Sequence, residues 1–161
     1  MSQAPDILAA ALGYAAQGQA VFPCHGIVDG RCTCGRPDCG SPGKHPRTAH
    51  GVKDATTNQA QIARWGELWL NSNVGIATGA ASGLVVIDVD GPAGEAALRE
   101  LNLLLPETAE VKTGRGRHLY YAAPGGAPSK TFGPTLSVRG DGLYVIAPPS
   151  LHISGRRYEW G

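Results

Sequence analysis

The stretch GLVVIDVDG, residues 83–91, constrains the fold more than any other part of the chain. It contains an apolar run over residues 84–89 that is almost unbroken, and such a run is typical of a strand covered on both faces near the centre of a sheet. The run ends in two acids, Asp88 and Asp90. Because side chains alternate along a strand, both carboxylates project from one face, where they repel each other unless a positive group lies between them. The stretch therefore predicts a central strand that ends in a charged site.

Helical and strand patterns alternate on both sides of this stretch. Residues 7–17 carry apolar side chains at helical spacing, and a capping box at Thr56 predicts a second helix through residue 68. Residues 94–105, rich in Ala, Leu and Glu and followed by Pro106, predict a third helix. We expect the other strands at residues 20–23, 73–78, 110–112, 118–122, 136–139, 143–147 and 158–160.

The chain has the size and composition of one folded domain. Its 161 residues suffice for a core, and its 42% hydrophobic and 17% charged residues are typical of a globular protein. The 23 glycines and 12 prolines indicate many turns and long loops. We therefore predict a single domain over residues 1–161 of the α/β (α+β) class, with one mixed sheet flanked by helices.

Nothing in the sequence predicts a membrane or secretory protein. No segment approaches the roughly 20 apolar residues that cross a bilayer, and the N-terminus lacks a signal-peptide pattern. The net charge of +1 argues against a protein that binds DNA through a general electrostatic field. We therefore expect a cytoplasmic protein with no membrane partner and with its four cysteines reduced.

Residues 24–47 form a segment that we call the cysteine loop. It is dense in Gly, Pro, Cys and Arg, and a long loop without regular structure needs another source of order. The pattern Cys-x-Cys-x4-Cys-x5-His suits a tetrahedral Zn²⁺ with no open position, which predicts a structural site. Cys24 or His25 could replace one ligand, and the alternative is a flexible loop with unliganded cysteines. The predicted zinc ligands are Cys32, Cys34, Cys39 and His45.

A second charged segment, KTGRGRHLYY, spans residues 112–121. Gly114 and Gly116 allow a close approach of the backbone to a ligand, and the neighbouring side chains supply the charge-assisted donors that hold phosphates. The alternative is a solvated basic hairpin in which the histidine packs against its neighbours. The candidate donors are Arg115, Arg117 and His118.

A third segment, LSVRGDGLYVIAPPS, places Arg139 and Asp141 at the end of a predicted strand. Arg139 could bind a phosphate or pair with Asp141. Carboxylates on one strand, a histidine and an arginine on others, and a divalent metal between them form the minimal set for in-line phosphoryl or nucleotidyl transfer. In this interpretation Mg²⁺ or Mn²⁺ binds Asp88 and Asp90. The alternative is a strand that ends in turn-forming residues, with Asp90 capping the next helix.

The order of these motifs resembles that of a known family. The matching elements are YAAQGQAVFP, GKHPR, NVGIATG, GLVVIDVD, TGRGRHLYY and VRGDGLYVIAPPS. Over residues 7–160 they are similar to the bifunctional DNA primase/polymerase (prim-pol) N-terminal domain of phage and plasmid replication proteins, in the archaeo-eukaryotic primase superfamily. Several members also carry a cysteine-rich loop before GKHP. The resemblance implies an archaeo-eukaryotic primase-like fold and a nucleotidyltransferase that copies single-stranded DNA from NTPs or dNTPs.

The resemblance also implies roles for individual residues. It places Asp88 and Asp90 on the metal motif and His118 on the catalytic histidine that contacts the incoming triphosphate. It places Arg139 near the nucleotide phosphates, as the arginine of the third motif.

The third motif contains the one departure from the family pattern. Ser137 stands where the family usually has a third acid, and a hydroxyl adds no charge to balance a second metal. Asp141 is then a further candidate ligand. The alternatives are a more weakly bound second metal and the loss of catalysis.

Two other functions are open to a chain with these motifs. A catalytically silent module that binds nucleotide or single-stranded DNA beside a replicative helicase is favoured by Ser137 and by the low net charge. A small zinc-stabilised hydrolase of phosphate esters could use the same acids. The family also implies a C-terminal helical bundle and often a helicase as partners. Because such a bundle can be needed for de novo priming, we expect a chain that ends at Gly161 to extend primers better than it makes them.

Overall fold

The computed structural model describes residues 5–161. The side chains of Asp6 and Asn58 accept hydrogen bonds from backbone N–H groups in the first turns of two helices, which fixes where each begins. None of the helices in residues 5–161 combines the length and the apolar character needed to cross a membrane. These helices are α1 (Ile7–Ala16), α2 (Gln59–Leu68) and α3 (Gly91–Glu100), with a short 3₁₀ helix, η1 (Gly51–Asp54).

The strands of residues 5–161 form three sheets, in which every pair of neighbouring strands is antiparallel. A three-stranded sheet has the order β1 (Val21–His25), β4 (Ser72–Ala77), β10 (Tyr144–Ala147). A hairpin in the cysteine loop pairs β2 (Ile27–Val28) with β3 (Arg31–Cys32). The third sheet has six strands in the order β11 (Glu159–Trp160), β6 (Ala109–Lys112), β7 (Arg117–Ala122), β5 (Leu84–Val89), β9 (Leu136–Arg139), β8 (Lys130–Thr131).

The α+β class is confirmed, but the prediction of one mixed sheet is wrong. β4 and β5 are consecutive in the sequence, and they belong to different sheets. β4 takes its partners from β1 and β10, which lie far away along the chain, and β5 takes β7 and β9. Strand patterns predict where strands lie, whereas the choice of partner depends on long-range packing of apolar faces.

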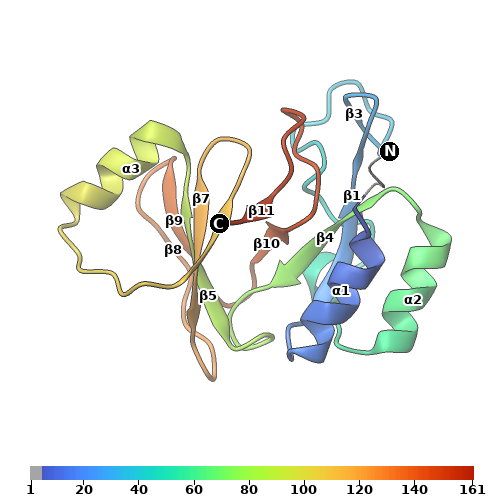
Figure 1. Ribbon diagram of the computed structural model, residues 1–161, viewed down its shortest axis with the longest axis horizontal. Helices are drawn as coiled ribbons and strands as arrows, with labels where there is room; N and C mark the ends of the chain where they lie inside the picture. The colour runs from blue at the N-terminus through green and yellow to red at the C-terminus, as the bar shows by residue number, and fades with distance from the viewer. Residues whose placement is uncertain (1–4) are drawn as a thin grey trace.

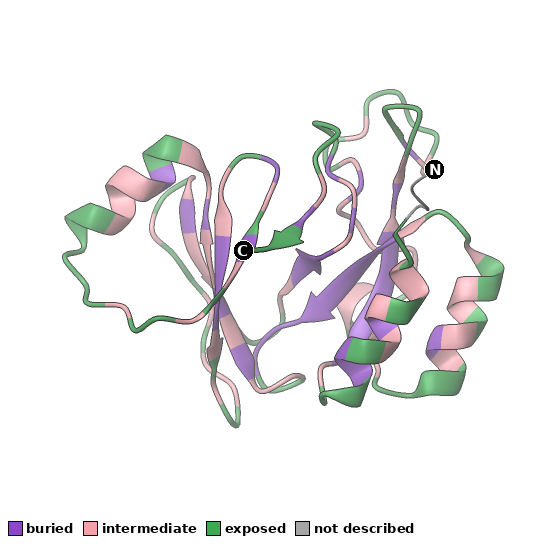
Figure 2. Ribbon diagram, viewed as in Figure 1, coloured by how far each residue is buried: buried purple, intermediate pink, exposed green. Residues whose placement is uncertain are grey.

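The two larger sheets share one hydrophobic core. α1 and α2 pack on the three-stranded sheet, and α3 packs on β5 and β9 at the other side of the molecule (Figure 1). The core joins side chains of α1 to side chains of β4, β5, β6 and β7, with Val74, Val86 and Val111 almost fully buried among them. The buried segments in Figure 2 therefore lie on the strands of both sheets.

Most predicted elements lie within two residues of their expected bounds, but α3 and the N-cap of α2 differ from the prediction, and β2, β3 and β8 were not predicted. β5 spans 84–89 as predicted. α3 begins and ends earlier than the predicted 94–105. Its end is marked by Asn102, which adopts a left-handed backbone conformation (φ 49°) directly after the last turn, as is typical of a helix C-terminus. The N-cap of α2 is Asn58, not Thr56, whose hydroxyl accepts a hydrogen bond from the Asn58 backbone (3.0 Å).

Candidate active site

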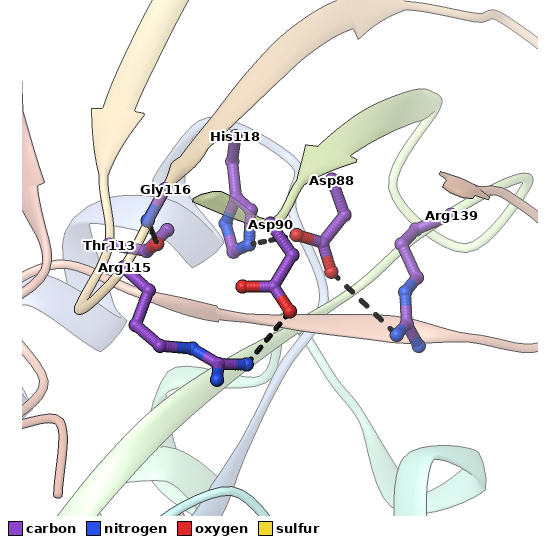
Figure 3. Close-up of polar contacts among 7 residues, drawn as sticks. All are labelled: Asp88, Asp90, Thr113, Arg115, Gly116, His118 and Arg139. Atoms are coloured by element: carbon purple, nitrogen blue, oxygen red, sulfur yellow. Dashed lines mark hydrogen bonds and ion pairs between the residues drawn. The ribbon is translucent and has the colours of Figure 1, made fainter. Parts of the chain in front are cut away.

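β5 places Asp88 at the centre of the candidate site. The strand lies between β7 and β9, with Asp88 opposite His118 on β7 and Ser137 on β9. One carboxylate oxygen lies 3.4 Å from Nε2 of His118 and the other lies 3.7 Å from Nη2 of Arg139. Figure 3 shows the carboxylate between these two side chains. The fold therefore brings together three residues that the sequence analysis assigns to one site.

Asp90 lies beside Asp88, immediately after β5. It occupies the N-cap position of α3, but its side chain makes no capping hydrogen bond. Its carboxylate instead accepts a hydrogen bond from Nη2 of Arg115 at 2.8 Å (Figure 3). Arg115 stands on a tight turn that is closed by a hydrogen bond from the Gly116 N–H to the Thr113 hydroxyl (2.9 Å). The capping role proposed as an alternative for Asp90 is thus replaced by an ion pair.

The two glycines of this turn serve the packing of the chain itself. A Cβ at Gly116 would collide with the carbonyl oxygen of Val89 on β5, and a Cβ at Gly114 would collide with the ring of His152. The turn can therefore lie directly against the end of β5 only because both positions lack a side chain.

Positive groups hold the Asp88 carboxylate in its ionised form. Burial by itself raises the pKa of Asp88, but the contact with His118 and the positive charges of Arg139 and Lys44 outweigh this effect. The pKa of Asp88 therefore lies below its ordinary value. The side chain is an anion at neutral pH, which is the form that binds a divalent cation.

These residues line a pocket with a volume of about 390 Å³. A pair of carboxylates and a hydroxyl supply the oxygen ligands that Mg²⁺ and Mn²⁺ prefer, and two guanidinium groups supply the planar donors that suit phosphates. The predicted site residues in its wall, together with Ser137, are Asp88, Asp90, Arg115, His118 and Arg139.

Two basic residues of the pocket were not predicted as site residues from the sequence. Lys44 reaches the pocket from the cysteine loop, and His152 reaches it from the segment after β10. Nδ1 of His152 accepts a hydrogen bond from the Ser154 N–H (3.0 Å), so the neutral ring carries its proton on Nε2. Burial and the nearby charges of Lys44 and Arg115 lower the pKa of His152, in spite of Asp90. Its ring is therefore a neutral donor at physiological pH.

Two predicted site residues lie outside the pocket. Arg117 precedes His118 on β7 and so points to the other face of the sheet, where it pairs with Glu95 at 2.6 Å and with Glu110 at 3.6 Å. Asp141 accepts a hydrogen bond from the Ala80 N–H (2.8 Å) and thereby joins the loop after β9 to the loop after β4. Both side chains have structural partners, so neither is one of the acids or phosphate-binding groups that line the pocket.

The cysteine loop brings its four predicted ligands together. The Sγ atoms of Cys32 and Cys39 lie 3.5 and 3.6 Å from Nε2 of His45, and all four ligand atoms, with that of Cys34, lie within 4.8 Å of one another. Zn–S bonds of about 2.3 Å and a Zn–N bond of about 2.0 Å at tetrahedral angles separate sulfur and nitrogen by about 3.5 Å. The cluster is therefore compatible with a structural zinc ion.

The clustered thiols influence one another's pKa values. A hydrogen bond with the backbone at Arg36 lowers the pKa of Cys34 to about 6. The pKa of Cys39 is raised, because desolvation and the neighbouring thiols outweigh its hydrogen bond with the backbone at Ser41. Three neighbouring thiolates repel one another unless a compensating charge lies between them, and a zinc ion would supply that charge.

Cys24 and His25 do not belong to this cluster. Cys24 is fully buried in the main core, and burial raises the pKa of its thiol. The ring of His25 stacks on His45 at a centroid distance of 4.4 Å, and its Nδ1 lies 2.9 Å from the Thr33 hydroxyl. His25 therefore supports a ligand from the side, as residues around metal sites commonly do.

The pocket combines the groups with which proteins hold divalent cations and phosphates, on an α+β scaffold. This class of site agrees with the protein family whose model matches the chain. The family model described as "Bifunctional DNA primase/polymerase, N-terminal" matches residues 11–161, and the chain belongs to this family. Membership implies nucleotidyltransferase activity in general, the binding of DNA and nucleotide, and the use of divalent metals. No curated protein and no solved structure gave a significant match.

Proposed function

We propose that the chain is the catalytic domain of a DNA primase/polymerase, which transfers nucleotides from NTPs or dNTPs to a growing strand on a single-stranded DNA template. The observation that carries this proposal is the position of Asp88. Its ionised carboxylate lies in one pocket with Asp90, His118 and Arg139, on strands that are distant in the sequence. We place this activity in phage or plasmid DNA replication, with a C-terminal helical bundle and a helicase as partners.

The carboxylates and the arginines exchange partners in this proposal. In the structure Arg115 neutralises Asp90 and Arg139 neutralises Asp88. Once the carboxylates bind Mg²⁺ or Mn²⁺, both guanidinium groups are free to donate hydrogen bonds to the phosphates of the nucleotide. Lost ion pairs are thus replaced by charge-assisted contacts to the substrate.

The reaction is an in-line substitution at the α-phosphate. The 3′ oxygen of the primer forms a bond to the α-phosphorus and gives its proton to water. The bond between the α-phosphorus and the oxygen that bridges it to the β-phosphorus breaks, which releases pyrophosphate. A divalent metal held by Asp88 and Asp90 would polarise the phosphate and stabilise the negative charge that develops in the transition state. His118 on β7 and Arg139 on β9 hold the triphosphate from the two strands that flank β5, which limits its motion relative to the attacking oxygen.

The different positions of two arginines give a first prediction. Replacing Arg117 by alanine should lower the free energy of unfolding by about 1 kcal/mol, because two half-exposed ion pairs are lost, and should change nucleotide affinity by less than about twofold. Replacing Arg139 by alanine should weaken nucleotide binding by about tenfold. Thermal unfolding and nucleotide titration of both variants check this prediction. Weakened nucleotide binding in Arg117→Ala, with unchanged binding in Arg139→Ala, would contradict it.

Ser137 gives a second prediction. A carboxylate at this position would lie directly opposite Asp88 on the adjacent strand. In Ser137→Asp the two acids should repel each other when no metal is bound. Together they should bind Mg²⁺ more tightly than Asp88 does beside Ser137, so the Mg²⁺ concentration needed for activity should fall by about tenfold. The rise in melting temperature on adding Mg²⁺ should also be larger than in the wild type. Equal metal dependence in both proteins would show that Ser137 does not face the metal.

Ser137 also favours a second candidate function, a catalytically silent module that binds nucleotide or single-stranded DNA beside a helicase. Primer extension on a primed single-stranded template, first with Mg²⁺ and then with Mn²⁺, distinguishes the two. Extension supports the polymerase. Binding of nucleotide without extension under either metal would favour the silent module, and Ser137→Asp would then be the variant to assay for restored activity.

A further inference from the structure

Lys44 connects the cysteine loop to the candidate active site. It lies in the wall of the same pocket as Asp88, His118 and Arg139, although it belongs to a loop that the sequence analysis treats as purely structural. It shares this wall with the carboxylate of Asp88 and with the ring of His152. Lys44 therefore belongs to the candidate site by its position in the fold.

The ammonium group of Lys44 has no carboxylate of its own. Among residues 5–161, no ion pair of 4.0 Å or less involves Lys44, whereas Arg115 and Arg139 each have one and Arg117 has two. Its side chain is only partly exposed. A partly buried cation in a pocket with basic neighbours is stabilised by an anion, and a triphosphate is the anion that the proposed reaction supplies.

The backbone at Lys44 is fixed from two sides. Its carbonyl accepts a hydrogen bond from the Tyr144 hydroxyl (2.7 Å), and the carbonyl of Gly43 accepts one from the Asn73 side chain (2.9 Å). The next residue is His45, whose Nε2 lies in the metal-ligand cluster. The Gly43 N–H also points at Sγ of Cys32 (3.4 Å). Ligands of the cluster thus hold the chain immediately before and after Lys44.

We propose that Lys44 binds the triphosphate of the incoming nucleotide and that the Cys3His cluster holds it in place, so that zinc occupancy sets nucleotide affinity. This inference rests on the proposed function and assigns a role to the zinc site beyond folding of the loop. The cysteine loop then contributes to nucleotide binding in the pocket through Lys44. Without zinc, the segment 43–45 keeps its hydrogen bonds from Asn73 and Tyr144 but loses the tie through Cys32 and His45, and the ammonium group is then free to leave the pocket.

Binding of inorganic triphosphate and of a dNTP, measured by calorimetry in Mg²⁺, tests the role of Lys44. Lys44→Ala should weaken both ligands by about tenfold or more, the factor typical of a charge-assisted hydrogen bond, and Lys44→Arg should restore part of the loss. Lys53→Ala, which removes an exposed lysine outside the pocket, is the matched control and should bind like the wild type. If Lys44→Ala also binds like the wild type, the inference is wrong.

A double-mutant cycle tests the link to zinc. Cys39→Ser should lose zinc by elemental analysis and lose triphosphate affinity by the same factor as Lys44→Ala. The double variant should bind triphosphate as tightly as either single variant, since both changes remove the same contact, that of Lys44 with the triphosphate. If the factors by which the two single variants weaken triphosphate binding multiply in the double variant, zinc affects the pocket independently of Lys44. In case Cys39→Ser does not fold, a zinc-selective chelator followed by added zinc should remove and then restore the affinity of the wild type.

The same experiment separates this inference from the proposed function. If the wild type neither binds a dNTP nor extends a primer, both fail together. If the wild type binds and extends while Lys44→Ala matches Lys53→Ala, only the role of Lys44 fails.

Discussion

Replacing Asp88 by asparagine should reduce nucleotide incorporation by about a thousandfold or more while the protein stays folded. The substitution keeps the size of the side chain and removes the negative charge between His118 and Arg139. Metal stabilisation of the transition state accounts for several kcal/mol, and about 4 kcal/mol corresponds to roughly a thousandfold in rate. Steady-state primer extension, with melting temperature as the folding check, measures the effect.

Asp141→Asn is the matched control for this substitution. Asp141 lies outside the pocket, and an asparagine oxygen can still accept the hydrogen bond from the Ala80 N–H. We therefore expect full activity in this variant. A large loss of activity in Asp141→Asn, with Asp88→Asn unaffected, would mean that the metal site is built differently from the pocket described above.

The pH dependence of stability gives an independent readout for Asp88. Because the pKa of Asp88 is lower in the folded protein than in the unfolded chain, its charge stabilises the fold above the unfolded pKa, and this stabilisation is lost as the pH falls through the folded pKa. Asp88→Asn should therefore be less stable than the wild type at neutral pH. The difference should disappear in acid, where the wild-type carboxyl is protonated too.

Loss of the zinc ligands is the change that should affect stability most. We expect purified wild type to contain about one zinc ion per chain and Cys39→Ser to contain almost none. Zinc binding at such sites supplies folding free energy directly, so the melting temperature should fall by about 10 °C or more. Elemental analysis and thermal unfolding are the measurements.

Cys24→Ala is the control for the zinc ligands. Cys24 is buried in the core and is not part of the cluster, so this variant should keep its zinc and lose only a few degrees of stability, roughly as expected for a small core cavity. Zinc-free wild type, or zinc lost on changing Cys24, would contradict the assignment of the ligands.

Local patterns predicted the parts of this fold that depend on local chemistry. The apolar run of β5, the acids at its end and the four ligands of the cysteine loop are all encoded by neighbours in the sequence. The division of the strands into two main sheets is not encoded in this way, because β4 pairs with strands that are distant along the chain. The same limit applies to Lys44 and His152, which reach the pocket from remote loops.

Arg117 illustrates a signal that was present in the sequence. Neighbouring side chains on a strand point to opposite faces, so Arg117 and His118 cannot both enter one pocket from β7. Applying the alternation that identified Asp88 and Asp90 would have separated them. The true end of α3 was also readable, since Asn102 is a residue type that commonly ends helices.

The most direct test of the account is whether a template dictates which nucleotide is incorporated. Primed homopolymer templates should each direct the wild type to add the complementary nucleotide, with Mg²⁺ or Mn²⁺ and with no addition in the Asp88→Ala, Asp90→Ala double variant. Incorporation that ignores the template, or none under either metal, would contradict the claim that this pocket is the active site of a template-directed nucleotidyltransferase.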